Sequence, residues 1–496
     1  MNRKRKSDAF CTNSDAERFE THDVHRKKPK IQSLSQDFID DCKVRFHNNP
    51  INIISRNTVN TVGVMGSCID PDRMNNISHV FEFSLKPEHV KATNQGHSGR
   101  CWMFAVLNIF RNLMMNRMNL KTFEFSQAYL FFWDKFERAN SYISWFIEHP
   151  EAKSGDNAFN YMISQYLSDG GWWNNFANLV DKYGIIPRDA MRDSINAENS
   201  EELNTILKEQ LDSVVAHIIN NKGLENKVYN LIRKKTMREV YNTLVKFLGE
   251  PPNTFDWTIL PEHADPLLFR GITKEIMNSL IGVQMNNSVE ENLHISEQFV
   301  VLTDIPNIEY NKLYEIRYTS NVKEGKNCTF LNLPIGELSR YAKKSIENNF
   351  PVWFVGDVRQ YFNWFYSVLD DQIEQRSLLF PDLYDMNKKQ RIIMRNVEGT
   401  HAMTLTGFST NEQKKLEAWQ VENSWGYYDE NVPGDDGFLY MSQTWFEKYV
   451  TAIAVQKSFL SRTIQNLFNT EPVVLNPWDS IAPAIRTNLV GIPKRY

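Results

Sequence analysis

The sequence contains no continuous apolar run of the about 20 residues that a membrane-spanning helix requires. It begins MNRKRKSDAF, a basic cluster with no apolar segment behind it. A secretory signal peptide needs such an apolar segment, so this start does not fit one. We therefore expect no membrane partner, and we predict a cytoplasmic location.

Cysteine is scarce, and no two cysteines have the close CxxC spacing of a zinc site or a redox motif. The five are Cys11, Cys42, Cys68, Cys101 and Cys328. Few, scattered cysteines argue against a disulfide framework and for a reducing compartment. No cluster of metal-ligating residues is visible either, so we expect neither a metal nor another cofactor.

The chain also lacks a strong excess of charge of either sign, with a net charge of -4 over 496 residues. Residues 1–30 hold nine Lys/Arg and five Asp/Glu, a net of +4, which leaves -8 for the remainder (-4 - 4). We predict that residues 1–30 are a disordered tail. Its basic clusters, at 3–6 and 26–30, suit a solvated tail, a nuclear import signal or a nucleic-acid contact. The acidic remainder disfavours nucleic acid as the main partner.

Apolar residues recur at helical spacing in three parts of the first half. The segment 33–48 and the very apolar segment 101–118 each predict a helix, the second one central and buried. Residues 199–249 predict two helices separated by Gly223, and we expect Asn199 and Glu202 to form a capping box at their start. The latter block, about 196–250, has the character of a helical insertion.

Strand patterns dominate after about residue 295. Segments with this character are 350–358, 402–409, 417–423 and 437–441. A helical first half followed by a sheet-rich second half predicts an α+β fold.

The strongest chemical signal is the run from Gln95 to Trp102, Gln-Gly-His-Ser-Gly-Arg-Cys-Trp. Cys101 would begin the buried helix, where the helix dipole and the N–H groups of the first turn favour a thiolate, the nucleophilic form of cysteine. The side-chain amide of Gln95 and the backbone N–H of Cys101 would form an oxyanion hole. We expect Gly96 and Gly99 to let this loop pass close to a substrate.

Two further motifs complete a catalytic set. His401 opens a strand and suits a general base aimed into a cleft. Asn423, in Val-Glu-Asn-Ser-Trp-Gly, would accept a hydrogen bond from the imidazole and orient it, and Trp425 would shield that bond. We also expect Trp425 to contribute to substrate binding. Alone, His401 suits a core histidine equally well, and Asn423 suits a turn residue.

Together, in this order, the three motifs resemble the papain superfamily. The gap of 300 residues between Cys101 and His401 (401 - 101) is about twice the usual one. The segments 123–135, 169–171, 182–187, 351–354 and 400–404, and Glu-Pro-Val-Val-Leu at 471–475, resemble the bleomycin hydrolase / aminopeptidase C family. The resemblance runs from about residue 35 to 485.

This resemblance implies a papain-like fold, a helical subdomain plus a β-barrel-like subdomain, with large helical insertions. It implies a catalytic domain over 31–470 and a C-terminal arm over 471–496 near the active-site cleft. It also implies a homohexamer with its active sites facing an inner chamber. Gly170 and Gly171 match a glycine pair that lines the substrate cleft, although Gly-Gly is also a common turn signal.

The implied activity is that of a broad-specificity cysteine aminopeptidase acting on peptides and on related amides such as bleomycin. In the family, the terminal carboxylate of the arm holds the ammonium group of the substrate. Here seventeen residues follow Asp479 (496 - 479), so we expect trimming, a looped tail or wider cleft access that permits endopeptidase activity.

Two other functions stay open at this point. One is a non-enzymatic hexameric scaffold or nucleic-acid-binding protein on the same fold. The other is a hydrolase of small amides or thioesters.

Overall fold

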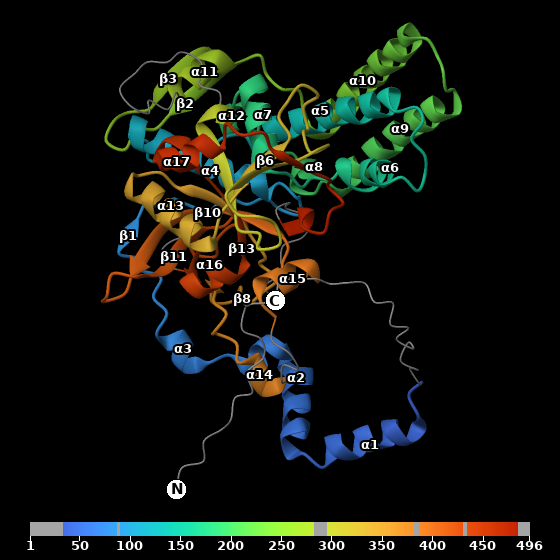
Figure 1. Ribbon diagram of the computed structural model, residues 1–496. Coiled ribbons are helices and arrows are strands. Elements are labelled where there is room, and N and C mark those ends of the chain that lie inside the picture. Colours follow the sequence, from blue (N-terminus) through green and yellow to red (C-terminus); the bar gives the residue numbers. More distant parts are fainter. Residues whose placement is uncertain (1–32, 87–89, 282–294, 381–385, 430–433, 485–496) are drawn as a thin grey trace. The chain divides into compact units, whose positions relative to one another are not determined.

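The computed structural model in Figure 1 describes residues 33–86, 90–281, 295–380, 386–429 and 434–484. The basic tail predicted at 1–30 and the last twelve residues of the predicted C-terminal arm lie outside this part of the chain. The described chain divides into two units, of which the first ends at Gly63 and the second begins at Val64.

The first unit is helical. It contains α1 (Gln36–His47), which confirms the helix predicted over 33–48, and most of α2 (Pro50–Cys68). Ser35 caps α1, because its side chain accepts a hydrogen bond from the backbone N–H of Phe38. The course of α2 is broken at Gly63, whose φ of 74° lies in the left-handed region.

The second unit opens with a helical layer around α4 (Cys101–Met118), the predicted buried helix. Nearly every side chain of α4 is buried, and α4 contacts both neighbouring helices and strands of the main sheet. The other helices of this part of the chain are α3 (Pro71–Asn75), α5 (Gln127–Glu148), α6 (Asn157–Tyr161) and α7 (Trp173–Tyr183).

The predicted helical block follows as α8 (Ile195–Glu198), α9 (Glu201–Asn220) and α10 (Asn226–Leu248), and α9 and α10 both pack on α5 (Figure 1). Gly223 separates α9 from α10 with a φ of 82°, as predicted, and Gly249 is the C-cap of α10. The expected capping box is wrong: the N-cap of α9 is Ser200, without a side-chain cap, because Asn199 instead ends α8.

The main sheet has twelve strands among the described residues, in the order β14-β5-β6-β4-β13-β7-β10-β11-β12-β9-β8, with β1 (Phe83–Ser84) also paired to β10. The four predicted strands are β7 (Val352–Gly356), β10 (His401–Thr410), β11 (Leu416–Glu422) and β12 (Phe438–Ser442). The remaining strands are β4 (Phe299–Thr303), β5 (Lys312–Ile316), β6 (Cys328–Asn332), β8 (Phe362–Asn363), β9 (Val368–Leu369), β13 (Val450–Gln456) and β14 (Val473–Leu475).

Smaller elements complete the unit. A separate hairpin pairs β2 (Thr254–Ile259) with β3 (Leu267–Thr273). The later helices are α11 (Lys274–Ile281), α12 (Ile295–Gln298), α13 (Ile335–Glu347), α14 (Arg376–Leu379), α15 (Lys388–Ile393), α16 (Gln443–Tyr449) and α17 (Arg462–Leu467). None of the described helices combines the length and the apolar character needed to cross a bilayer.

A buried ion pair joins the helical layer to the sheet. Arg111 on α4 donates through Nη2 to Oε1 of Glu422, the last residue of β11, at 2.5 Å, and both side chains are almost fully buried. Two opposite charges removed from water stabilise each other only while both are present. The pair therefore fixes the helix that begins at Cys101 against the strand that precedes Asn423.

Removing one partner of this pair should destabilise the protein strongly. We expect Arg111→Met to lower the free energy of unfolding by about 3 kcal/mol, because it leaves the Glu422 carboxylate buried and unpaired. The double variant Arg111→Met/Glu422→Leu should regain most of that loss. Urea unfolding of the three proteins is the measurement, and a double variant as unstable as the single one would contradict the interpretation.

Candidate active site

Cys101 is the first residue of α4 and is 1% exposed. The residue before it, Arg100, forms no side-chain cap on the helix. The N–H groups at a helix start carry partial positive charge and stabilise a negative group placed there. The observed position of Cys101 thus matches the position predicted for a thiolate.

The loop before α4 is fixed by Gln95 and Ser424. The Ser424 hydroxyl donates to Oε1 of Gln95 at 2.7 Å, and the backbone N–H of Gln95 donates to the Ser424 carbonyl at 2.9 Å. Because Oε1 accepts from Ser424, the orientation of the Gln95 amide is set. Its NH₂ group donates one hydrogen to the Ser98 carbonyl at 2.7 Å and carries a second hydrogen.

The two loop glycines pack closely against the protein's own chain. A Cβ at Gly96, whose φ is +59°, would lie 2.5 Å from the carbonyl oxygen of Glu198. A Cβ at Gly99 would lie 2.8 Å from Cβ of Asp169. Both glycines therefore admit the protein's own chain, at the start of the helical block and at the segment before Gly170. Packing accounts for both glycines, and the close approach of a substrate to this loop stays a prediction.

Arg100 ties the same loop to the chain before α8. Its guanidinium forms two hydrogen bonds of 3.0 Å with the carboxylate of Asp193, and its Nε donates to the Ser98 hydroxyl at 2.8 Å. The Arg100 side chain is fully buried. A bidentate contact between a guanidinium and a carboxylate fixes the orientation of both groups as well as their separation. The side chain of Arg100, the residue before Cys101, is therefore held in one orientation.

His401 and Asn423 form the predicted pair. Nε2 of His401 lies 2.8 Å from Oδ1 of Asn423, and the same oxygen accepts from the backbone N–H of Ser424 at 2.8 Å. An oxygen can only accept, so Nε2 carries the proton and Nδ1 of the neutral ring is the acceptor. Trp425 stacks on the imidazole with a centroid distance of 4.7 Å, in the shielding position expected for it.

Contacts between α4 and β10 bring Cys101 toward His401. The Thr404 hydroxyl, three residues after His401, donates to the carbonyl of Ala105, one helical turn after Cys101, at 2.7 Å. The second connection runs from Gln95 through Ser424 to Asn423, the partner of His401. These contacts hold β10 against α4 and link Gln95, on the loop before Cys101, to the pair of His401 and Asn423.

Burial controls the protonation of His401. The ring is fully buried, and this desolvation lowers its pKa to about 4, although the hydrogen bond to Asn423 acts in the opposite direction. Nδ1 has no hydrogen-bond partner among the described residues. The imidazole is therefore neutral near pH 7 unless a negative charge, such as a thiolate, lies beside it.

The glycine pair lies beside a buried carboxylate. Burial alone would raise the pKa of Asp169, but its ion pair with Lys135 at 2.6 Å and hydrogen bonds from the side chains of Ser200 and Asn204 lower the pKa to about 2. Asp169 also accepts from the N–H of Gly99 at 3.2 Å. A Cβ at Gly171 would lie 2.5 Å from the Trp102 ring, and the Gly170 carbonyl accepts from the Arg138 guanidinium at 3.0 Å. Packing explains Gly171, and substrate binding by either glycine stays a prediction.

The C-terminal arm approaches His401. Its strand β14 pairs in parallel with β5, and the carbonyl of Pro483 accepts from the N–H of Gly399, two residues before His401, at 2.8 Å. Ala482 and Ala484 are buried.

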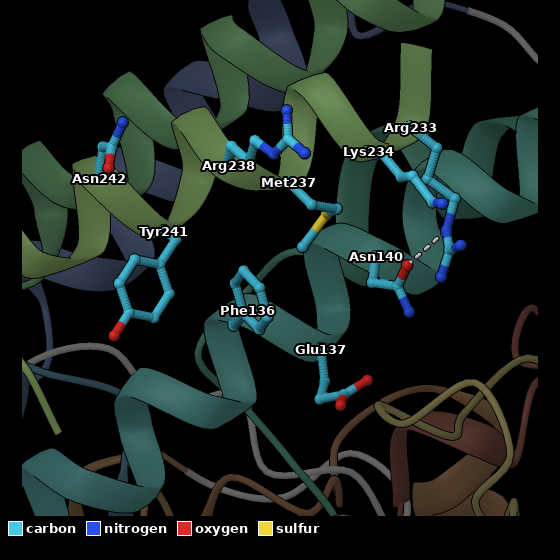
Figure 2. A pocket seen from close by; sticks show the side chains of 9 residues that line it. All are labelled: Phe136, Glu137, Asn140, Arg233, Lys234, Met237, Arg238, Tyr241 and Asn242. Atoms are coloured by element: carbon cyan, nitrogen blue, oxygen red, sulfur yellow. Dashed lines mark hydrogen bonds between the residues drawn. The ribbon is translucent and has the colours of Figure 1, made fainter. Parts of the chain in front are cut away.

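A cavity of about 460 Å³ lies elsewhere, between α5 and α10. Its wall includes Phe136, Met237 and Tyr241, and Arg233 donates to Oδ1 of Asn140 at 2.7 Å across it (Figure 2). None of the residues predicted for catalysis or substrate binding lines this cavity.

Comparisons with known proteins agree on one family. The model described as "Peptidase C1-like family" matches residues 33–482. Aminopeptidase G of Lactobacillus delbrueckii subsp. lactis is 32% identical, covering 89% of this chain and 98% of that protein. Bleomycin hydrolase of Mus musculus is 30% identical, covering 88% and 95%. The crystal structure of PepW from Lactobacillus rhamnosis has a TM-score of 0.84 at 27% identity, covering 90% and 98%.

The low pKa of His401 predicts a pH dependence of stability when no thiolate is present. In Cys101→Ala, the contribution of the neutral imidazole is fully present above the unfolded pKa of about 6.5 and is lost as the pH falls toward 4. We expect this variant to lose about 2–3 kcal/mol more between pH 7 and pH 4.5 than Cys101→Ala/His401→Gln does. Urea unfolding at both pH values measures the difference, and equal losses would show that the ring is not desolvated.

Proposed function

The chain belongs to the Peptidase C1-like family and is a cysteine peptidase, and we propose that it is a broad-specificity aminopeptidase in which Cys101 is the nucleophile. It has the α+β, papain-like fold predicted from its sequence. The observation that carries the assignment of residues is the buried hydrogen bond between His401 and Asn423, which leaves Nδ1 of His401 as the acceptor for a thiol proton.

The proposed reaction is acyl transfer in two steps. The Sγ thiolate of Cys101 attacks the carbonyl carbon, and the oxyanion is held by the Gln95 amide and the Cys101 N–H. His401 donates its proton to the leaving nitrogen, the C–N bond breaks, and a thioester remains. Water then attacks the thioester while His401 takes its proton, which releases the acid and the thiol.

Asn423 and Ser424 support this sequence by orientation. The Asn423 oxygen holds the ring with Nδ1 directed away from it, and Ser424 fixes which end of the Gln95 amide carries the NH₂ group. No side chain then has to change its orientation while a proton moves or while negative charge develops on the substrate oxygen. Trp425 excludes water from the His401–Asn423 bond.

Selectivity for the N-terminal residue of a peptide is assigned to the C-terminal arm. Its contact with Gly399 places buried arm residues close to His401, which suits a barrier to long chains on one side of the scissile bond. Such a barrier favours removal of N-terminal residues over internal cleavage. The names of similar proteins, aminopeptidase G and bleomycin hydrolase, agree with this choice and with small amides as further substrates.

Assembly as a homohexamer, a cytoplasmic or nuclear location and any contact of the tail with nucleic acid stay predictions from the sequence. The same is true of the catalytic domain boundaries at 31–470.

Substitutions at the catalytic positions should separate the proposed roles. We expect Cys101→Ala to abolish hydrolysis of an aminoacyl-amidomethylcoumarin, and Asn423→Ala to lower kcat by about a hundredfold because the ring loses its orientation. Cys42→Ser, which alters an exposed cysteine, is the matched control and should leave the rate unchanged. Full activity of Cys101→Ala would refute the assignment of the nucleophile.

The proposed barrier formed by the C-terminal arm is tested with an N-acetylated substrate. The free aminoacyl-amidomethylcoumarin should be hydrolysed far faster than its N-acetylated form. Acetylation removes the ammonium group and lengthens the substrate on the side that the arm blocks. Initial rates at equal concentrations measure this. Equal rates would contradict aminopeptidase selectivity and favour an endopeptidase.

A further inference from the structure

The proposed reaction fixes the side of the site from which the leaving group departs. His401 must donate its proton to the leaving nitrogen, so the departing part of the substrate lies on the side of the imidazole. Trp425 stacks on that ring, and Phe362 lies against Trp425 with a centroid distance of 5.6 Å. A peptide chain that leaves the scissile bond in this direction therefore runs over aromatic rings.

Two cavities continue this path. The inner one, of about 60 Å³, is lined by Asn423, Trp425 and Phe362. The outer one, of about 490 Å³, is lined by Phe365, Tyr366 and residues at and after α3. They share three lining residues, Tyr428, Gly434 and Asp435. Because three residues line both, the two cavities are neighbours, and we call them together the aromatic groove, which begins at Asn423.

The outer part of the groove exposes aromatic rings on short, fixed turns. Phe365, Tyr366 and Tyr428 are 59%, 43% and 65% exposed. Phe365 and Tyr366 lie at the tip of the β8–β9 hairpin, where the N–H of Tyr366 donates to Oδ1 of Asn363 at 3.2 Å. The N–H of Tyr428 donates to the Asp435 carbonyl at 2.7 Å. Several large exposed rings around one cavity are typical of a recognition surface.

The charge of the groove selects among peptides. No Lys or Arg is present among the described residues that line the two cavities, and Asp435 contributes a carboxylate. His79, on the outer wall, supplies no positive charge at neutral pH because burial lowers its pKa. A free C-terminal carboxylate would find no cation among these described lining residues. The groove thus suits the interior of a longer peptide better than the end of a dipeptide.

We propose that this aromatic groove binds the leaving-group portion of peptide substrates and favours aromatic or large apolar residues at the second and third positions after the scissile bond. The inference rests on the proposed function and adds a substrate preference to it. The rings gain contact area only when the substrate extends past Trp425, so small leaving groups are hydrolysed independently of the groove.

The test compares two pentapeptide amides, Ala-Gly-Phe-Phe-Gly and Ala-Gly-Gly-Gly-Gly, by the initial rate of alanine release. The unaltered protein should have a kcat/KM about tenfold or more higher for the aromatic peptide, since filling an apolar pocket discriminates by that order. The variant Phe365→Ala/Tyr366→Ala should lose most of this preference. Tyr428→Ala, on the shared wall, should reduce it as well.

Alanyl-amidomethylcoumarin is the internal control, because its leaving group does not reach the outer cavity. Both variants should hydrolyse it within about twofold of the unaltered rate, which also shows that they are folded. Phe38→Ala, which removes a ring of 53% exposure from α1, should change neither measurement.

The outcomes are distinguishable. Normal turnover of the coumarin substrate with no preference between the two peptides would refute the proposed role of the groove and leave the proposed function intact. So would an aromatic preference that persists in both groove variants. Absence of turnover of any substrate by the unaltered protein would overturn the proposed function, and this inference with it.

Discussion

The packing of the first turns of α4 against β10 and β11 is the constraint on which the rest of the site depends. Cys101 begins the helix, His401 begins one strand, and Asn423 follows the end of the next. Three buried contacts hold these elements together: Thr404 with the carbonyl of Ala105, Arg111 with Glu422, and Gln95 with Ser424. Each joins residues about 300 positions apart, so the chemistry exists only in the folded chain.

Burial gives the site its electrostatic character. Asp169 and Arg100 are buried but paired, so their charges persist and serve to fix the loop before Cys101. His401 is equally buried but has a neutral partner, so burial alone favours its neutral form. In the proposed mechanism, a thiolate at Cys101 supplies the negative charge that favours the protonated form of His401.

Much of this arrangement is predictable from the sequence, because the signals are local. The periodicity of 101–118 and the runs around His401 and Asn423 give α4, β10 and β11 to within one or two residues. The chemistry of Cys, His and Asn in that order predicts the catalytic set. By contrast, the short strands β4, β5 and β6 carry no comparable motif, so the sequence does not predict them individually.

The supporting residues could not be found in this way. Ser424, Asp169, Asp193 and Arg111 act through partners distant in the chain, and a lone Ser, Asp or Arg carries no signal of such a partner. The loop glycines illustrate the same limit: the pattern indicates close approach at Gly96 and Gly99, but only the fold shows that the approaching groups are Glu198 and Asp169. The predicted capping box does not form because Asn199 is the C-cap of α8.

The most direct test of the central claim is the pH dependence of alkylation at Cys101 by a small neutral reagent, followed on the Cys101 peptide by mass spectrometry. Resolving the peptide separates this site from the exposed Cys42. The account predicts that the rate follows an ionisation far below the pKa of about 8.5 of a free thiol, and that His401→Gln moves it upward. A rate that follows the ordinary thiol pKa in both proteins would contradict the account.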